Sequence, residues 1–153
     1  MISKVFGELN YDYLWEGEID ICSYNKIVKV KIDINDEDEK GITKLQDESF
    51  IKFKEREVEL DCLIQNAIFS YYKNIIKNEE YIDTYLIDSI AEIKQPYEMS
   101  ELVKLQQLCI PEIEEDREII LLFTCKWNYE HGLGVKIVNE KIVKVGIQEE
   151  VLI

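Results

Sequence analysis

Apolar and polar residues alternate in residues 15–21, and they alternate again from Val28 onward within residues 27–34. Alternation with a period of two predicts strands that bury one face. The turn-like residues 23–26 lie between the two runs and predict an antiparallel hairpin, and residues 5–9 suggest a short strand before it. The side chains on the apolar faces are Trp15, Gly17, Ile19 and Ile21 in the first run, and Val28, Val30, Ile32 and Ile34 in the second.

The period changes after a charged connector at residues 35–41. Ile42, Leu45, Phe50 and Phe53 predict a first helix. A second helix is indicated by apolar residues at i, i+3, i+4 and i+7 over more than four turns, and no glycine or proline separates it from the first. Its apolar face is Leu60, Leu63, Ile64, Ala67, Ile68, Tyr71, Tyr72, Ile75 and Ile76, and its predicted solvent face is Asp61, Gln65, Asn66, Ser70, Lys73 and Asn74.

Residues 79–97 carry a weaker pattern. One further short helix that Pro96 ends is predicted from the apolar residues Ile82, Leu86, Ile90 and Ile93. Ser100 is of the type that caps helix N-termini, and it predicts a short helix over residues 101–105.

The last third of the chain returns to strands. Residues 108–113 and 118–125 predict an antiparallel pair, and residues 134–138 and 142–145 predict a hairpin around residues 139–141. The order of strands, helices and strands is typical of the α+β class. We therefore expect an antiparallel sheet built from N-terminal and C-terminal strands, with two or three helices packed on one face.

Composition places the chain among globular proteins and restricts its partners. Its 153 residues fit one domain spanning residues 1–153, and no apolar run approaches the roughly 20 residues of a membrane span. The formal net charge is −14, which disfavours nucleic acid and anionic membranes as partners and favours a basic protein. With no export signal at its start, the chain is expected in the cytoplasm.

The four cysteines, Cys22, Cys62, Cys109 and Cys125, lie far apart in the sequence. With a single histidine they form no zinc pattern, and we expect reduced, buried thiols and neither metal nor cofactor. Residues 33–38 begin like a calcium loop, but Asp38 and Lys44 stand where an EF-hand needs glycine and glutamate. They predict a solvated connector, and a weak cation site is the lesser alternative.

The sequence carries no established catalytic motif. The conventional nucleophile and base would be Cys125 and His131, but Cys125 alternates with apolar residues of a predicted strand, and a buried thiol ionises poorly. We therefore predict no catalytic residues and regard an enzyme as the less favoured class.

Residues 127–134, WNYEHGLG, concentrate uncommon residues. One interpretation is a structural corner, with Trp127 as anchor and with Gly132 and Gly134 as turn residues or sites of close backbone approach. The other is a binding site formed by Trp127, Tyr129, Glu130 and His131 on a loop held by a rigid sheet.

The stretch W-N-Y-E-H-G-L-G-V at residues 127–135, followed by V-K-V-G-I-Q at residues 143–148, resembles the carboxyl-terminal signature of an uncharacterised bacterial family of small acidic proteins. The signature reads W-x-x-E-H-G-L-G-V, a short hairpin, then V-G-x-Q-D, and Glu149 stands here in place of the aspartate. The resemblance implies a cytoplasmic protein of unknown function and assigns no reaction.

Three functions remain open. The favoured one is a non-enzymatic, acidic protein-binding domain of the immunity or antitoxin type, using the acidic clusters at residues 35–40 and 112–118. The second is a small-ligand binder or enzyme at the corner of Trp127–His131. The third is a structural or oligomerising module, such as a homodimer, in which Val151, Leu152 and Ile153 pair with another copy.

Overall fold

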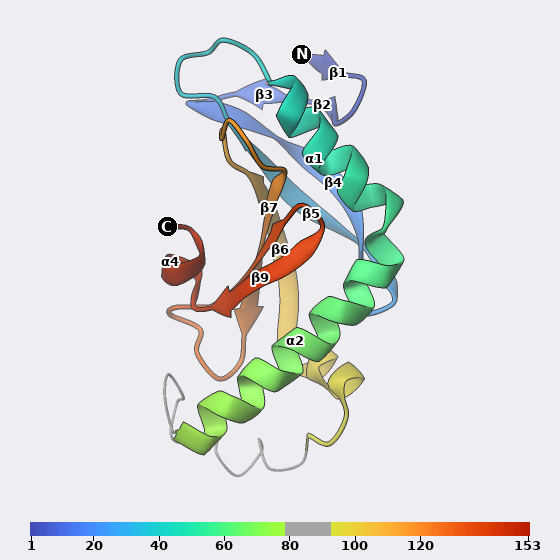
Figure 1. The fold of residues 1–153 in the computed structure, drawn as a ribbon, viewed down its shortest axis with the longest axis vertical. Helices are drawn as coiled ribbons and strands as arrows, with labels where there is room; N and C mark the ends of the chain where they lie inside the picture. The colour runs from blue at the N-terminus through green and yellow to red at the C-terminus, as the bar shows by residue number, and fades with distance from the viewer. Residues whose placement is uncertain (79–92) are drawn as a thin grey trace.

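The computed structural model describes residues 1–78 and 93–153 (Figure 1). These residues form a mixed α+β structure with a seven-stranded sheet and a separate two-stranded one. The strands are β1 (Ile2–Ser3), β2 (Gly7–Glu8), β3 (Asn10–Tyr11), β4 (Leu14–Ser23), β5 (Lys26–Asn35), β6 (Val103–Ile110), β7 (Glu118–Cys125), β8 (Leu133–Val138) and β9 (Lys141–Gly146). The helices are α1 (Lys44–Glu55), α2 (Glu57–Asn78), the 3-10 helix η2 (Pro96–Glu101) and α4 (Gln148–Val151).

Both predicted hairpins are confirmed. Strands β4 and β5 pair antiparallel along their full lengths around Tyr24 and Asn25, whose φ angles are 51° and 64°. Strands β8 and β9 pair around Asn139 and Glu140, whose φ angles are also positive. Two consecutive residues with positive φ make the tight turn whose twist matches that of the strands.

The large sheet has the order β3-β4-β5-β6-β7-β8-β9. The prediction of an antiparallel sheet is wrong at one interface, because β5 and β6 run parallel. The cause is the connection between them. Helices α1 and α2 carry the chain from the end of β5 back toward its beginning (Figure 1), so β6 starts at the same end of the sheet as β5.

The two long helices agree with the sequence pattern. Thr43 caps α1, and Gln46 completes a capping box with it. Only Arg56 separates α1 from α2, as the absence of a breaker predicted. None of the helices in the described part of the chain is long and apolar enough to cross a membrane.

The main core lies between the sheet and the helices α1 and α2. The chain's amino-terminal residues also contribute to it, since the rings of Phe6 and Phe50 lie 5.0 Å apart. The opposite face of the sheet buries Ile120 and Leu122 under Val151 of α4. The expectation that helices cover one face is therefore wrong, because the carboxyl-terminal turn folds back over the other. Members of the main core include Ile21, Val30, Ile32, Ile34, Leu60, Ile68, Tyr72, Leu108, Ile110, Leu121, Phe123 and Val135.

The helix predicted over residues 101–105 is wrong. Ser100 lies inside η2, and from Val103 the chain is a strand in which Val103 and Leu105 are buried and Lys104 is exposed. Pro96 begins η2 at a position where its missing N–H costs nothing, instead of ending a helix. The predicted helix residues Ile82, Leu86 and Ile90 lie outside the described residues.

The predicted solvent face of α2 is also partly wrong. Asp61 and Gln65 are buried, while Leu63 is exposed. The Asp61 carboxylate accepts hydrogen bonds from the backbone N–H groups of Tyr24 and Asn25, both at 2.8 Å. The β4–β5 turn therefore needs a buried acceptor on α2, and this requirement overrides the amphipathic pattern.

Candidate functional site

The corner at residues 127–134 joins β7 to β8. Trp127 is 2% exposed and packs on Tyr72 of α2 with ring centroids 4.9 Å apart. The side-chain oxygen of Asn128 accepts from the His131 N–H, and the Asn128 carbonyl accepts from the Gly132 N–H. Leu133 is fully buried. The buried side chains of Trp127 and Leu133, together with these local hydrogen bonds, make the segment a rigid part of the fold.

The two glycines of the corner act in different ways. Gly132 has a φ of 61°, and a Cβ there would lie 2.5 Å from the Gln148 side-chain nitrogen and 2.9 Å from the Phe123 carbonyl oxygen. Gly134 lies within β8 and is not a turn residue. A Cβ on Gly134 would lie 2.9 Å from the Cβ of Val151, so the glycine permits the close approach of α4.

Gln148 holds the corner through hydrogen bonds to residues that lie 17 and 25 positions before it in the sequence. Its side-chain amide donates to the carbonyl of Phe123 at 3.0 Å, and its backbone N–H donates to the carbonyl of His131 at 3.1 Å. The two halves of the signature read in the sequence, W-N-Y-E-H-G-L-G-V and V-G-I-Q, therefore meet in space.

The polar candidates of the corner lie on its surface. Tyr129 is 64% exposed, and Glu130 is also exposed. His131 is partly buried, with Nδ1 3.4 Å from a carboxylate oxygen of Glu149 and Nε2 4.0 Å from one of Glu130. Trp127, by contrast, is too deeply packed to touch a ligand. The binding role suggested for Tyr129, Glu130 and His131 stays a prediction.

The thiols do not follow a single pattern. Cys125 is buried, and its Sγ donates to the carbonyl of Asn128 at 3.4 Å. Cys22 and Cys109 are partly buried and Cys62 is exposed, which corrects the expectation of four buried thiols. Burial raises the pKa of Cys109 to about 12, so that thiol remains protonated. Among the described residues, no three histidine, cysteine or acidic side chains are grouped to hold a metal ion.

The prediction that the connector after β5 is solvated is wrong for Asp36. Asp36 is 1% exposed, and its carboxylate accepts from the Trp15 indole, the Lys40 N–H and the Gly41 N–H at 2.8 to 2.9 Å. Burial raises the pKa of Asp36, but these hydrogen bonds outweigh it and hold the pKa below its ordinary value. Its carboxylate is thus engaged by the loop itself.

Gln46 ties this connector to the next loop. Its side-chain amide is buried and lies within hydrogen-bond distance of the carbonyls of Asn35, Ile110 and Pro111, at 2.8, 3.4 and 3.3 Å. The ends of the parallel strands β5 and β6 are therefore fastened to the first turn of α1. The loops that leave these two strands begin from a common, rigid base.

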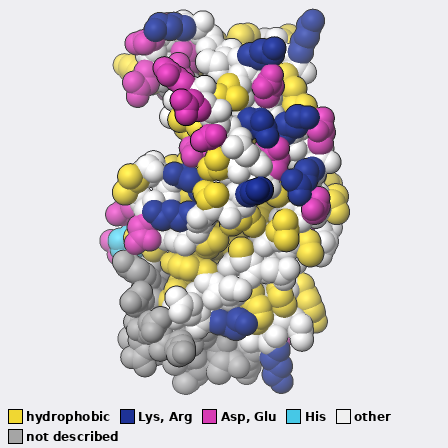
Figure 2. Space-filling model, viewed as in Figure 1, with side chains coloured by type: hydrophobic (Ala, Val, Ile, Leu, Met, Phe, Trp, Pro, Cys, Tyr) yellow, Lys and Arg dark blue, Asp and Glu magenta, His cyan; other side chains and the backbone are white. Residues whose placement is uncertain are grey.

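Exposed carboxylates gather on this base and form what we call the acidic end. Three segments contribute: the β3–β4 turn, the β5–α1 connector and the β6–β7 loop. Tyr13, 88% exposed, lies in the first of them. Figure 2 shows acidic side chains concentrated at the upper left, over this part of the molecule. The carboxylates of the acidic end are Asp12, Glu37, Asp38, Glu39, Glu112, Glu114, Glu115 and Asp116.

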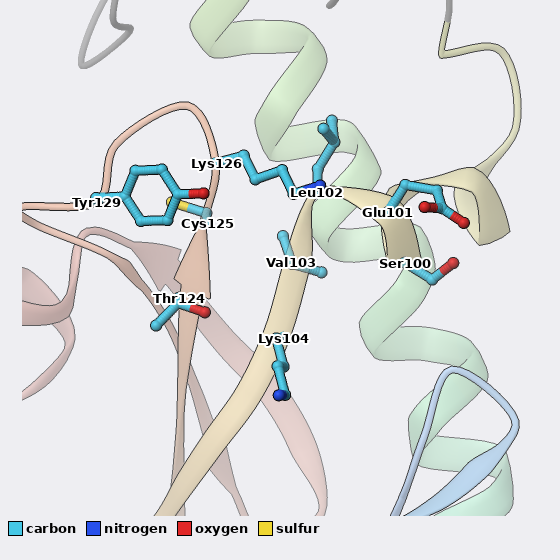
Figure 3. Close-up of a pocket in the computed structure, with 9 residues that line it drawn as sticks. All are labelled: Ser100, Glu101, Leu102, Val103, Lys104, Thr124, Cys125, Lys126 and Tyr129. Atoms are coloured by element: carbon cyan, nitrogen blue, oxygen red, sulfur yellow. The ribbon is translucent and has the colours of Figure 1, made fainter.

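A shallow hollow of about 410 Å³ lies at the other end of the sheet, beside the corner (Figure 3). Tyr129 lines it, together with Ser100, Glu101, Lys104 and Lys126. Neither Glu130 nor His131 is among its lining residues. The sequence pattern gave no sign of this hollow, because its walls come from η2, β6 and β7.

The chain belongs to a family known as a domain of unknown function, DUF6985, whose model matches residues 5–152. No curated protein and no solved structure matches the chain. The family assigns no activity.

Proposed function

We propose that this protein is a non-enzymatic binding domain whose acidic end captures a basic protein. In the sharpest form of this proposal it neutralises a basic toxin, as an immunity protein or antitoxin does. The observation that supports it is the set of eight exposed carboxylates on three segments that share a rigid base.

Charge at the acidic end is only partly compensated. Lys40 pairs with Asp38 at 3.2 Å, and Arg117 pairs with Glu140 at 2.9 Å at the edge of the cluster. The chain as a whole carries −14. A field of this sign raises the association rate of a basic partner and makes that rate sensitive to salt.

The hydrogen bonds of Asp36 and Gln46 should raise the affinity for a partner. Asp36 and Gln46 hold the connector and the β6–β7 loop before any partner arrives, so little ordering entropy is lost on binding. Tyr13 has a φ of 66° and stands exposed beside the carboxylates. An exposed tyrosine among charged groups is a common anchor of protein interfaces.

The test is affinity capture from source-cell lysate at low and high salt, read by mass spectrometry, with three forms of the protein. One is the wild type. The second reverses the acidic end by Glu114→Lys, Glu115→Lys and Asp116→Lys. The third is a matched control that makes the same change in net charge elsewhere, by Glu18→Lys, Glu55→Lys and Glu59→Lys, all at exposed positions.

The proposal expects one basic protein retained by the wild type and the control at low salt, weakened at high salt, and lost by the acidic-end variant. Co-expression should then relieve any toxicity of that protein. Equal retention by the acidic-end variant, or equal loss by the control, would refute the acidic end as the binding surface.

Two alternatives from the sequence have less support. Trp127 is buried in the core, so among the predicted site residues only Tyr129, Glu130 and His131 remain to contact a ligand. At the carboxyl terminus Val151 is buried within its own chain, so an oligomerising role would depend on Leu152 and Ile153. An unchanged elution volume on size-exclusion chromatography after deleting those two residues would remove that role.

A further inference from the structure

The large sheet is split at one interface. The parallel strands β5 and β6 are paired only from Lys31 to Ile34 and from Gln107 to Ile110. Their first halves, Lys26–Val30 and Val103–Gln106, show no pairing with each other, although each is paired with its other neighbour. A register shift in β6 between Leu105 and Gln107 marks where the two strands part, since a bulge bends the strand that carries it.

A hollow of about 350 Å³ occupies this split. Its apolar floor is formed by Val28 on one side and by Val103 and Leu105 on the other. It adjoins the hollow of Figure 3, with which it shares Ser100, Glu101, Val103 and Lys104. Together they make one furrow that runs across the start of β6.

The furrow is basic in an acidic protein. Lysines that line it are Lys26, Lys29, Lys104 and Lys126, and the acidic lining residue is Glu101. Over the whole chain the ratio is reversed, with 18 basic and 32 acidic residues. Lys29 lies 3.5 Å from Asp20, but both side chains are well exposed. Ion pairs in water are weak, so Asp20 neutralises little of the positive charge of Lys29. The local field therefore favours a negatively charged occupant.

Two kinds of polar group in the furrow lack protein partners. The hydroxyl of Tyr24 is buried and finds no hydrogen-bond partner among the described residues. Burial raises the pKa of Tyr24, so the hydroxyl stays a donor at neutral pH. Backbone groups of alternate residues point to opposite sides of a strand, so half of those in residues 27–30 face the split instead of β4.

We propose that an extended acidic peptide segment binds in the split as an added strand. Unpaired strand edges supply main-chain hydrogen bonds, the apolar floor receives alternate side chains, and the lysines receive the carboxylates between them. The turn that carries Tyr24 is already fixed by Asp61, so the site is formed before the peptide arrives. This site is independent of the acidic end, which lies at the opposite ends of the same two strands.

The experiment is an NMR titration of the ¹⁵N-labelled full chain. The probe is an eight-residue peptide of alternating valine and glutamate, with blocked ends, taken to millimolar concentration. We expect amide shift changes confined to residues 23–30 and 100–105, and slower hydrogen exchange at those amides of residues 27–30 that face the split. A peptide of alternating valine and lysine should bind at least about tenfold more weakly, because the lysines of the furrow repel its positive charges.

Three controls separate strand addition from simple attraction of anions. A Val-Glu peptide methylated at alternate backbone nitrogens should lose binding, because it cannot pair along its edge. The double variant Lys26→Glu and Lys104→Glu should weaken binding about tenfold. The matched variant Lys44→Glu and Lys141→Glu, at two other exposed lysines, should not. A dispersed spectrum of each free variant establishes that it is folded.

Several outcomes would overturn the proposal. It fails if no shifts occur at millimolar peptide, or if they fall outside the furrow. It also fails if the methylated peptide binds as well as the parent, or if inorganic phosphate produces the same shifts, because the furrow would then be a site for small anions.

Discussion

The two ends of the β5–β6 strand pair are built in opposite ways. Where the strands end they are paired, and Gln46 clasps the carbonyls of Asn35, Ile110 and Pro111. Where the strands begin they part around a hollow. The closed end carries exposed carboxylates, and the open end carries lysines.

The difference teaches how one sheet can offer two surfaces of different kinds. At the closed end the two strands are paired and Gln46 engages the carbonyls that follow them, so exposed side chains are the main groups that a partner meets, which suits recognition by charge and by an aromatic anchor. At the open end the backbone itself is available, which suits an extended segment. Four predictions test this contrast, from the largest expected effect to the smallest.

Gln46→Leu should lower the free energy of unfolding by about 3 kcal/mol, because buried carbonyls lose their donor and α1 loses half of its capping box. Urea denaturation followed by circular dichroism measures the change. Ser100→Ala at the open end, an exposed position, is the comparison and should change it by less than about 0.5 kcal/mol. An equal loss of unfolding free energy at the two positions would contradict the distinction between the closed end and the open end.

Gly132→Ala should cost about 2 kcal/mol, since alanine there combines a positive φ with close contacts to Gln148 and the Phe123 carbonyl. The corner holds the end of β7 next to the furrow, so this variant tests its structural role. The exposed neighbour offers a matched substitution, Glu130→Ala, which should stay within about 0.5 kcal/mol. If Glu130→Ala costs as much as Gly132→Ala, the corner is not held as described.

Asp36→Asn should cost about 1 kcal/mol at neutral pH by weakening three hydrogen bonds to a carboxylate. The folded pKa of Asp36 lies below its ordinary value of 3.8, so its contribution is complete above about pH 3.8 and is lost as the pH falls through the folded pKa. The stability gap between wild type and variant should therefore narrow below that pH in denaturant titrations. A gap that widens with acidification would contradict the account of the connector.

Reversing charge at the open end should have the smallest effect on stability. Lys26→Glu with Lys104→Glu is expected to change the free energy of unfolding by less than about 0.5 kcal/mol, because both side chains are exposed. The measurement is the same urea series. A large loss would mean that these lysines hold the split together, and the binding experiment would then need single substitutions.

Local patterns predicted much of this architecture. Alternation in residues 15–21 and 27–34 identified the first hairpin, and helical periodicity identified α2. Trp127 proved to be a core residue, as the structural interpretation of the corner predicted. These features depend on residues close together in the sequence, which is why a single chain reveals them.

Features that depend on distant residues were missed. Strand direction at the β5–β6 interface is set by the path of the helices, and the burial of Asp61 is set by a turn nearly forty residues away. Val151 folds onto Ile120 and Leu122 because Gly134 leaves room, which only the packed structure reveals. The position of Tyr13 in a polar turn was the one feature of the sequence that could have identified it as an exposed residue. No feature of the sequence could have identified the lysines of the furrow.

Residue-resolved hydrogen exchange along β5 tests the contrast most directly. Amides of Lys31–Ile34 that face β6 should exchange slowly, while amides of residues 27–30 that face the split should exchange orders of magnitude faster, since they have no partner strand. Amides on the β4 side should be protected throughout and serve as the internal reference. Uniform protection on the β6 side would mean that the sheet is closed there, and the two-ended account would be wrong.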